Sequence, residues 1–189
     1  ITEETILKSK FNEMKESPYP FFRATAHLFY KDIDSLLIPI PSEWKQTPRI
    51  KTWIQGDLHT QNLGFFENAD GQIKLDVNDF DESFIAPFYL DLIRFVTSIF
   101  LQREDVDFKF SPKEASDLAE YFLEEYQETL SEISEDGKEL ELIENNLDGF
   151  PKDTVDELKD KKSNTTLLAK WTKPVEGKIC FDLSNPELC

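Results

Sequence analysis

The chain has 189 residues, 39% of them hydrophobic, and includes 16 phenylalanines and three tryptophans. This is enough apolar surface for one sizeable core and too much for a fully disordered chain. The formal charge of −17, from 38 acidic and 21 basic residues, argues against binding to nucleic acids or membranes, because so acidic a surface repels phosphate groups.

Two cysteines, Cys180 and Cys189, predict no disulfide framework, and they form no metal-binding pattern with the two histidines. No apolar run approaches the roughly 20 residues that a transmembrane helix needs, and no signal peptide is visible. We therefore expect a cytoplasmic protein.

The N-terminal part of the chain predicts helices. A short charged helix is expected over 3–16, with Ser17-Pro18 ending it. Apolar residues recur at helical spacing over 20–36, which predicts a second helix. An irregular connection is then expected around three prolines, Pro39, Pro41 and Pro48.

A group of short strands follows. Residues 50–54, 63–66 and 72–77 have the composition and alternation of strands. Residues 67–71 have the turn chemistry of a hairpin, so the last two strands should pair. Residues 86–102 are apolar on most faces, which predicts a buried helix.

The C-terminal part is more acidic. A capping box with proline at the first helical position, Ser111-Pro112-Lys113-Glu114, predicts a helix to about Ser131. Residues 135–165 are expected to form an acidic helical insertion or extension, interrupted at Gly149-Phe150-Pro151. Residues 178–181 have strand character.

The segment with the clearest chemistry lies between the first strand and the buried helix. Gly56-Asp57-Leu58-His59-Thr60-Gln61-Asn62 follows one strand, and Asn78-Asp79-Phe80-Asp81 follows the hairpin. The hairpin should bring Asp57, Asn62 and Asp79 to one end of a small sheet. Phosphoryl transfer uses one carboxylate to orient or deprotonate the acceptor hydroxyl, and a second carboxylate with an amide oxygen to hold Mg²⁺ on the nucleotide phosphates.

The spacing of these residues resembles that of protein kinases, in which a metal-binding Asn follows the catalytic Asp by five residues. It is still more similar to the aminoglycoside and choline kinase branch, with His-Gly-Asp-Leu-His-x-x-Asn and a later Ile-Asp-Phe. Gln55 stands where that branch often has His. The resemblance implies that Asp57 is the catalytic base and that Asn62 and Asp79 bind ATP with Mg²⁺ or Mn²⁺. By the same resemblance, Asp91 braces the catalytic loop.

Four neighbouring residues have alternative interpretations. His59 could act catalytically near the phosphates or structure the loop. Arg23 could bind a cofactor phosphate or a substrate carboxylate, or brace an acidic residue. Asp81 could be a further metal ligand or cap the turn before Ser83. Asp91 could brace the loop or interact only with its own helix dipole.

The span from Ser17 to Ser98 also resembles a bacterial family, the domain-of-unknown-function 2252 family. The resemblance rests on three stretches, which are Ser17 to Ala24 (with Ala24 in place of the usual glycine), Gly56 to Gly64, and Asp76 to Glu82. It implies that members are longer than 189 residues and carry a glycine-rich stretch and a lysine-bearing strand after this segment. The nucleotide-covering lobe is therefore expected to be absent here.

Together these features predict an α+β, protein-kinase-like C-lobe over residues 1–189, mostly helical with a small antiparallel hairpin sheet, and incomplete. The expected function is ATP- and Mg²⁺-dependent phosphate transfer to a small-molecule hydroxyl or amine. One alternative is a pseudokinase or fragment that binds a nucleotide or a protein partner, with 135–165 as an interaction surface. Another is a metal-dependent phosphohydrolase that uses the same carboxylates.

Overall fold

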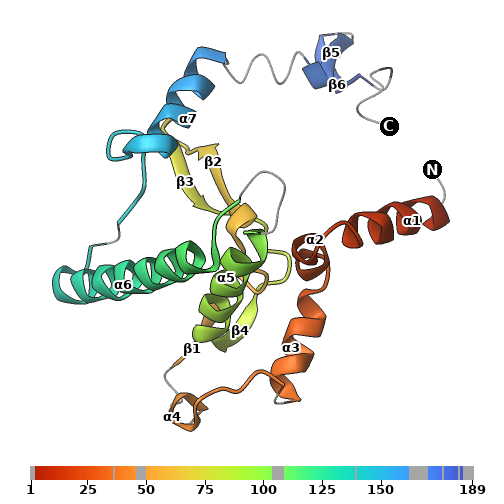
Figure 1. Cartoon of the computed structure of the whole chain (residues 1–189). Helices are drawn as coiled ribbons and strands as arrows, with labels where there is room; N and C mark the ends of the chain where they lie inside the picture. Colours follow the sequence, from red (N-terminus) through yellow and green to blue (C-terminus); the bar gives the residue numbers. More distant parts are fainter. Residues whose placement is uncertain are drawn as a thin grey trace. The chain divides into compact units, whose positions relative to one another are not determined.

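The computed structural model describes residues 3–35, 37–45, 50–103, 109–138, 140–161, 170–175, 177–182 and 184. It has an α+β composition with small two-stranded sheets (Figure 1). The helices are α1 (Glu3–Met14), α2 (Pro18–Arg23), α3 (Ala26–Asp34), α4 (Ser42–Lys45), the 3₁₀ helix η2 (Thr60–Asn62), α5 (Tyr89–Gln102), α6 (Pro112–Asp136) and α7 (Gly149–Lys161). The strands are β1 (Lys51–Ile54), β2 (Leu63–Glu67), β3 (Ile73–Val77), β4 (Phe84–Pro87), β5 (Thr172–Val175) and β6 (Lys178–Phe181).

The chain divides into two compact units, where the sequence predicted a single domain. One unit comprises Ile1–Gly64 and Val77–Leu140, and the other comprises Phe65–Asp76 and Glu141–Cys189. The division arises because the end of the β2–β3 hairpin pairs with the C-terminal segment: the Leu75 amide donates to the Leu142 carbonyl at 2.8 Å.

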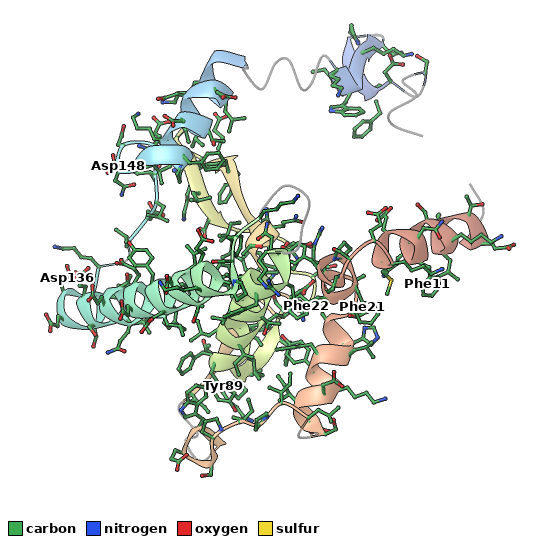
Figure 2. The ribbon with its side chains drawn as sticks, in the orientation of Figure 1. Phe11, Phe21, Phe22, Tyr89, Asp136 and Asp148 are labelled. Carbon is green, nitrogen blue, oxygen red and sulfur yellow. The ribbon has the colours of Figure 1, made fainter. Side chains whose placement is uncertain are left out.

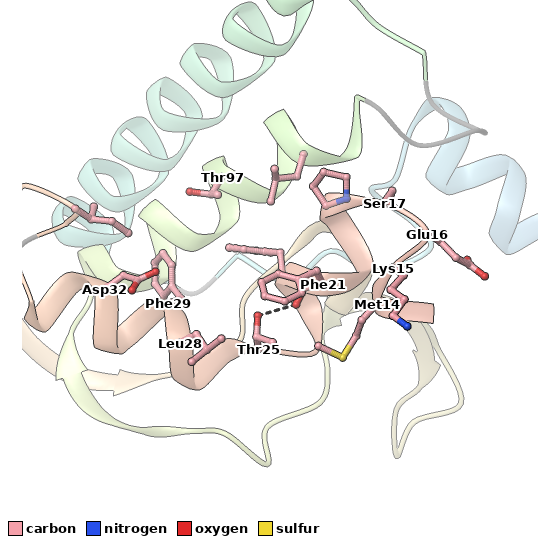
Figure 3. A pocket seen from close by; sticks show the side chains of 14 residues that line it. Met14, Lys15, Glu16, Ser17, Phe21, Thr25, Leu28, Phe29, Asp32 and Thr97 are labelled. Atoms are coloured by element: carbon pink, nitrogen blue, oxygen red, sulfur yellow. Dashed lines mark hydrogen bonds between the residues drawn. The ribbon is translucent and has the colours of Figure 1, made fainter. Parts of the chain in front are cut away.

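The helix expected over 20–36 is in fact two helices, α2 and α3. Thr25 interrupts them with a non-helical backbone, and its hydroxyl donates to the Phe21 carbonyl at 2.7 Å (Figure 3). A threonine side chain that bonds a carbonyl four residues back competes with the helical backbone, which explains the break. The irregular connection contains the short helix α4, which was not predicted, while Pro48 lies outside the described residues.

Strand β4 was missed by the sequence analysis, which placed a helix from residue 86. It pairs antiparallel with β1, with Lys51 opposite Pro87 and Ile54 opposite Phe84. Pro87 explains the strand, since proline has no N–H for a helical ladder and is tolerated at the end of an edge strand. The helix begins two residues later, at Tyr89.

The core of the first unit is built around α5. Its N-terminal residues Tyr89 and Leu90 pack with Ile54 and Ala86 from the β1–β4 pair. Further along α5, Phe95 and Ile99 pack on α6 through Ala115, Ala119 and the ring of Phe122, whose centroid lies 4.4 Å from that of Phe95. Burial of each large apolar side chain contributes roughly 1.5–3 kcal/mol, so α5 is the element that holds this unit together.

The capping box of α6 is confirmed. The Ser111 hydroxyl accepts from the Glu114 amide at 3.2 Å, and the Glu114 carboxylate accepts from the Ser111 amide at 2.7 Å. The helix runs beyond the expected Ser131 to Asp136, where Gly137 ends it in a left-handed conformation at φ 67°. Glycine adopts this conformation without steric cost, which makes it a common helix terminator.

The acidic segment over 135–165 is only partly helical, and residues 139 and 162–165 lie outside the described residues. Gly149-Phe150-Pro151 begins α7 instead of interrupting a helix, because proline is tolerated in the first turn. The strand expected at 178–181 is β6, and β5 pairs with it. Among the described helices, none is long and apolar enough to cross a membrane.

Candidate active site

The loop after β1 begins at a glycine that no other residue could replace without strain. Gly56 has φ +88°, and a Cβ at this position would lie 2.1 Å from the Glu82 carbonyl oxygen. The left-handed backbone and the close approach both require the missing side chain. The loop that carries Asp57 is thereby packed directly on the turn that follows Asp79.

The side chains of Asp91 and Gln55 both help to hold this loop in place. The Asp91 carboxylate, in the first turn of α5, accepts from the amides of Gln55 at 2.7 Å and Gly56 at 3.1 Å. The bracing role predicted for Asp91 is therefore observed. The Gln55 carboxamide donates to the carbonyls of Asn78 at 3.2 Å and Asp79 at 2.6 Å, and accepts from the Asp57 amide at 2.6 Å. A neutral histidine, with one donor and one acceptor, could not make all three bonds.

Asn62 lies beneath the loop and is 4% exposed. Its side-chain nitrogen donates to the backbone carbonyl of Asp57 at 3.0 Å. Its backbone carbonyl accepts from the backbone N–H of Asn78 at 2.9 Å. Since the nitrogen is engaged, the carboxamide oxygen is the atom through which this side chain could ligate a cation. The residue joins the Asp57 loop to the Asn78–Asp79 turn.

Asp57 is paired with Arg94, a residue of α5 whose side chain is completely buried. The Arg94 Nε lies 2.6 Å from the Asp57 Oδ1, and the Nη2 contacts the same oxygen. Burial raises the pKa of the Asp57 carboxyl group above its ordinary value, and the Arg94 guanidinium opposes this shift. The second oxygen, Oδ2, lies 3.9 Å from the His59 Nε2.

A cavity of about 330 Å³ brings several of the predicted site residues together. Asp57, His59, Asp79 and Arg23 all line it. The other residues that line it are Lys10, Glu13, Met14, Pro20 and Ala24. Asn62 is buried and bonds the Asp57 carbonyl, and neither it nor Asp81 is part of the described lining.

The turn after β3 holds three interacting carboxyl groups. Asp79 has the left-handed φ of 59°, a conformation that aspartate tolerates better than most residues. A hydrogen bond with Asp81 raises the pKa of Asp79, whereas bonds with Glu82 and Asp79 lower the pKa of Asp81. Carboxylate oxygens are the ligands that hard cations prefer, so the turn has the donor chemistry of a hard cation site.

The protein ligands alone do not complete a metal site. Within the described part of the chain, no group of three or more His, Cys, Asp or Glu side chains is arranged to hold a metal ion. Asn62 and Asp79 would therefore need oxygen ligands from elsewhere, which is the usual situation of Mg²⁺ in nucleotide sites. Asp81 also interacts with the Glu82 backbone amide, in accord with the turn-capping alternative, so a metal role for Asp81 stays a prediction.

Comparison with known sequences places the chain in a family. The sequence model of a family described as "Uncharacterized protein conserved in bacteria (DUF2252)" matches residues 3–189. The chain belongs to the DUF2252 family. No curated protein and no solved structure matches the sequence.

His59 is buried in this DUF2252 chain, at 2% exposure, and among the described residues its Nδ1 has no hydrogen-bond partner. Desolvation, together with the positive charges of Arg23 and Arg94, lowers the pKa of His59 to about 4. The imidazole is therefore neutral at pH 7. Its ring meets that of Tyr19 edge-on, with centroids 6.2 Å apart. These contacts accord with the loop-structuring alternative, and a catalytic role stays a prediction.

The lowered pKa of His59 predicts a loss of stability in acid. His59 takes up a proton near pH 6.5 in the unfolded chain and only near pH 4 in the folded chain. The contribution of neutral His59 to the free energy of unfolding is therefore fully present above pH 6.5 and is lost as the pH falls toward 4. This loss should be on the order of 3 kcal/mol. Urea unfolding of the wild type and His59→Gln across this range measures it, with the exposed His27→Gln as the control. An identical pH dependence in all three proteins would refute the assignment.

Arg94 is a site residue that the sequence analysis missed. It is one of only two charged residues in α5, the other being Asp91, and a lone arginine in an apolar helix needs a buried partner. This composition of α5 could have identified Arg94 from the sequence. Arg23, by contrast, reaches the cavity, but its side chain makes no hydrogen bond or ion pair with the described residues, so it is Arg94 that braces the acidic residue.

A larger cavity of about 620 Å³ lies elsewhere in the DUF2252 chain and differs in character (Figure 3). Apolar side chains dominate its lining, among them Met14, Phe21, Leu28 and Phe29. Phe21 and Phe22, which both line it, are labelled on α2 in Figure 2. The charged groups of its described lining, Lys15, Glu16 and Asp32, are exposed, so the polar cavity at Asp57 is the better candidate for catalysis.

Proposed function

We propose that this chain carries the catalytic segment of a phosphotransferase, which transfers phosphate from ATP with Mg²⁺ or Mn²⁺ to a small-molecule hydroxyl or amine. One observation carries the proposal. Asp57 and Asp79, from two different loops, line a single cavity, and Asn62 is fixed on the Asp57 carbonyl by its amide nitrogen. Phosphoryl transfer uses this set of oxygen donors for positioning and charge neutralisation.

In this proposal Asp57 orients the acceptor and removes its proton. Arg94 occupies Oδ1, which leaves Oδ2 for the acceptor. The raised pKa of Asp57 makes it a better base than an ordinary aspartate, because a base works best with a pKa near the working pH.

Asn62 and Asp79 would hold the cation together with the nucleotide phosphates. The cation would bind the Asp79 carboxylate, whose pKa the hydrogen bond with Asp81 and the charge of Asp81 raise, and it would balance the negative charge of this turn. When bound, it would neutralise charge on the transferred phosphate. Asp81 is close enough to Asp79 to add a further oxygen ligand.

The order of the elements supports a kinase-like C-lobe as the architecture. The strand β1 leads into the Asp57 loop, the β2–β3 hairpin leads to the Asp79 turn, and α5 contributes Asp91 as a brace. The sequence has six glycines and no glycine-rich phosphate loop. A separate covering lobe is therefore part of the proposal.

A non-catalytic nucleotide-binding module is the second candidate, and the Asp57–Arg94 pair favours it. A carboxylate bound on one oxygen by a buried guanidinium has a structural role whether or not it also acts as a base. In this case the cation and the nucleotide would still bind, but no phosphate would be transferred.

The first test is Mg²⁺-dependent binding of a non-hydrolysable ATP analogue, measured by calorimetry. Asp79→Asn should weaken this binding at least about tenfold, since loss of even an indirect contact to a metal often costs that much. The matched control is Asp76→Asn, which removes the same charge from β3, where Asp76 pairs with Lys74 at 3.0 Å.

Equal Mg²⁺ dependence in the wild type and Asp79→Asn would remove Asp79 from the site. An assay of phosphate transfer to a panel of hydroxyl and amine acceptors then distinguishes the phosphotransferase from the non-catalytic module. Binding without any transfer by the full-length protein would favour the non-catalytic module.

A further inference from the structure

The cavity that contains Asp57 and Asp79 also contains two cationic side chains from the N-terminal helices. Lys10 comes from α1, and Arg23 is the last residue of α2. We infer that Arg23 and Lys10 form a binding site for an oxyanion, a phosphate or carboxylate group of a ligand in this cavity.

Both cations lack a protein partner in the part of the chain that the structure describes. Neither side chain makes a hydrogen bond or an ion pair with any of the described residues, although three carboxylates, Glu13, Asp57 and Asp79, line the same cavity. Lys8, on the same helix as Lys10, pairs with Glu4 at 2.8 Å. The positive charges of Lys10 and Arg23 are therefore not used by the described carboxylates and stay available to a ligand in the cavity.

Arg94 already fills the structural role of an arginine beside Asp57. Arg94 supplies both contacts to the Asp57 Oδ1 from within the core. Arg23 is exposed and influences Asp57, His59 and Asp79 through its charge without bonding any of them. Its guanidinium fork is left available for a planar or tetrahedral anion, which arginine binds through two parallel hydrogen bonds.

The cavity is small, and both positive and negative side chains line it. At about 330 Å³ it is near the lower limit of ligand pockets, which range over about 300–1,000 Å³, so it suits one anionic group and not a whole nucleotide. If the proposed function holds, an oxyanion between Arg23 and the cation at Asp79 would also be neutralised from two sides. Assigning this anion to the nucleotide or to the acceptor rests on the proposed function, but the oxyanion site itself does not.

The test uses inorganic phosphate as the probe and the full chain as the protein. Calorimetry on the wild type should show binding that Arg23→Gln weakens about tenfold or more, which is the usual scale for a hydrogen bond to a charged group, and that Lys10→Gln also weakens. Lys8→Gln is the matched control from the same helix and should bind phosphate as the wild type does. All three side chains are exposed, so none of these changes should unfold the protein.

A second experiment repeats the phosphate titration with the Mg²⁺ complex of a non-hydrolysable ATP analogue present at saturation. It shows whether the anion belongs to the nucleotide or to the acceptor. If the analogue displaces phosphate and itself binds Arg23→Gln more weakly, the site takes the donor phosphate. If phosphate still binds and still depends on Arg23, the site takes an anionic group of the acceptor. Both results support the oxyanion site.

Two results would overturn the inference: no phosphate binding by the wild type at millimolar concentration, or equal binding by the wild type, Arg23→Gln and Lys10→Gln. Failure of the proposed function would look different. Phosphate binding would then depend on Arg23, but no acceptor would be phosphorylated and Asp79→Asn would leave Mg²⁺-dependent nucleotide binding intact.

Discussion

Arg94→Met is expected to lower the free energy of unfolding by about 3–5 kcal/mol, the usual cost of removing one partner from a buried ion pair. The Arg94 guanidinium is fully buried, and it bonds Asp57 and also the Phe22 carbonyl at 3.0 Å. It also stacks on the rings of Phe22, at 4.0 Å from the centroid, and Phe29, at 5.0 Å. Methionine keeps much of the apolar volume, so most of the expected loss comes from the charge and its hydrogen bonds.

Urea unfolding monitored by circular dichroism measures this effect. Lys113→Met, which breaks the exposed pair between Lys113 and Asp117, is the control and should change stability little. The decisive comparison adds Asp57→Asn to Arg94→Met. The double variant should be destabilised by less than the sum of the two single changes, because neither charge is then left without its partner. Additive losses would show that the two charges do not stabilise each other.

In the reaction that we propose, Asp57→Asn is expected to lower the rate of phosphate transfer at least about 100-fold, the usual contribution of a positioned base. Asparagine keeps the shape and the hydrogen-bond acceptor but cannot take a proton. Binding of the Mg²⁺–nucleotide complex should persist, since the proposal places the cation at Asn62 and Asp79. The measurement is a steady-state transfer assay, at a temperature where the variant is shown to be folded.

Glu13→Gln is the matched control, because Glu13 is another carboxylate that lines the same cavity. It should retain transfer close to the wild-type rate. A similar loss in both variants would mean that the general charge of the cavity, and not Asp57 in particular, supports the reaction. Full activity in Asp57→Asn would exclude Asp57 as the base.

The features predicted well from the sequence are those fixed by local chemistry. The capping box at Ser111 and Glu114 depends on residues three apart, and the approach of Asn62 to the Asp79 turn follows from one hairpin. The missed features depend on distant partners. Arg94 meets Asp57 across 37 positions, and β4 is a strand only because β1 lies beside it. A short apolar run such as Phe84–Pro87 fits either a strand or a helix.

The division of the chain has a practical consequence for finding the smallest fragment that keeps the site. The chain passes between its two units three times, after Gly64, Asp76 and Leu140. A protein shortened to end at Leu140 would retain every residue of the proposed site. It would also lose the partners of the hairpin, including the amide of Glu144, which donates to the Ile73 carbonyl at 2.9 Å. The hairpin end would then be an open edge with unpaired backbone groups, the kind of surface through which proteins aggregate.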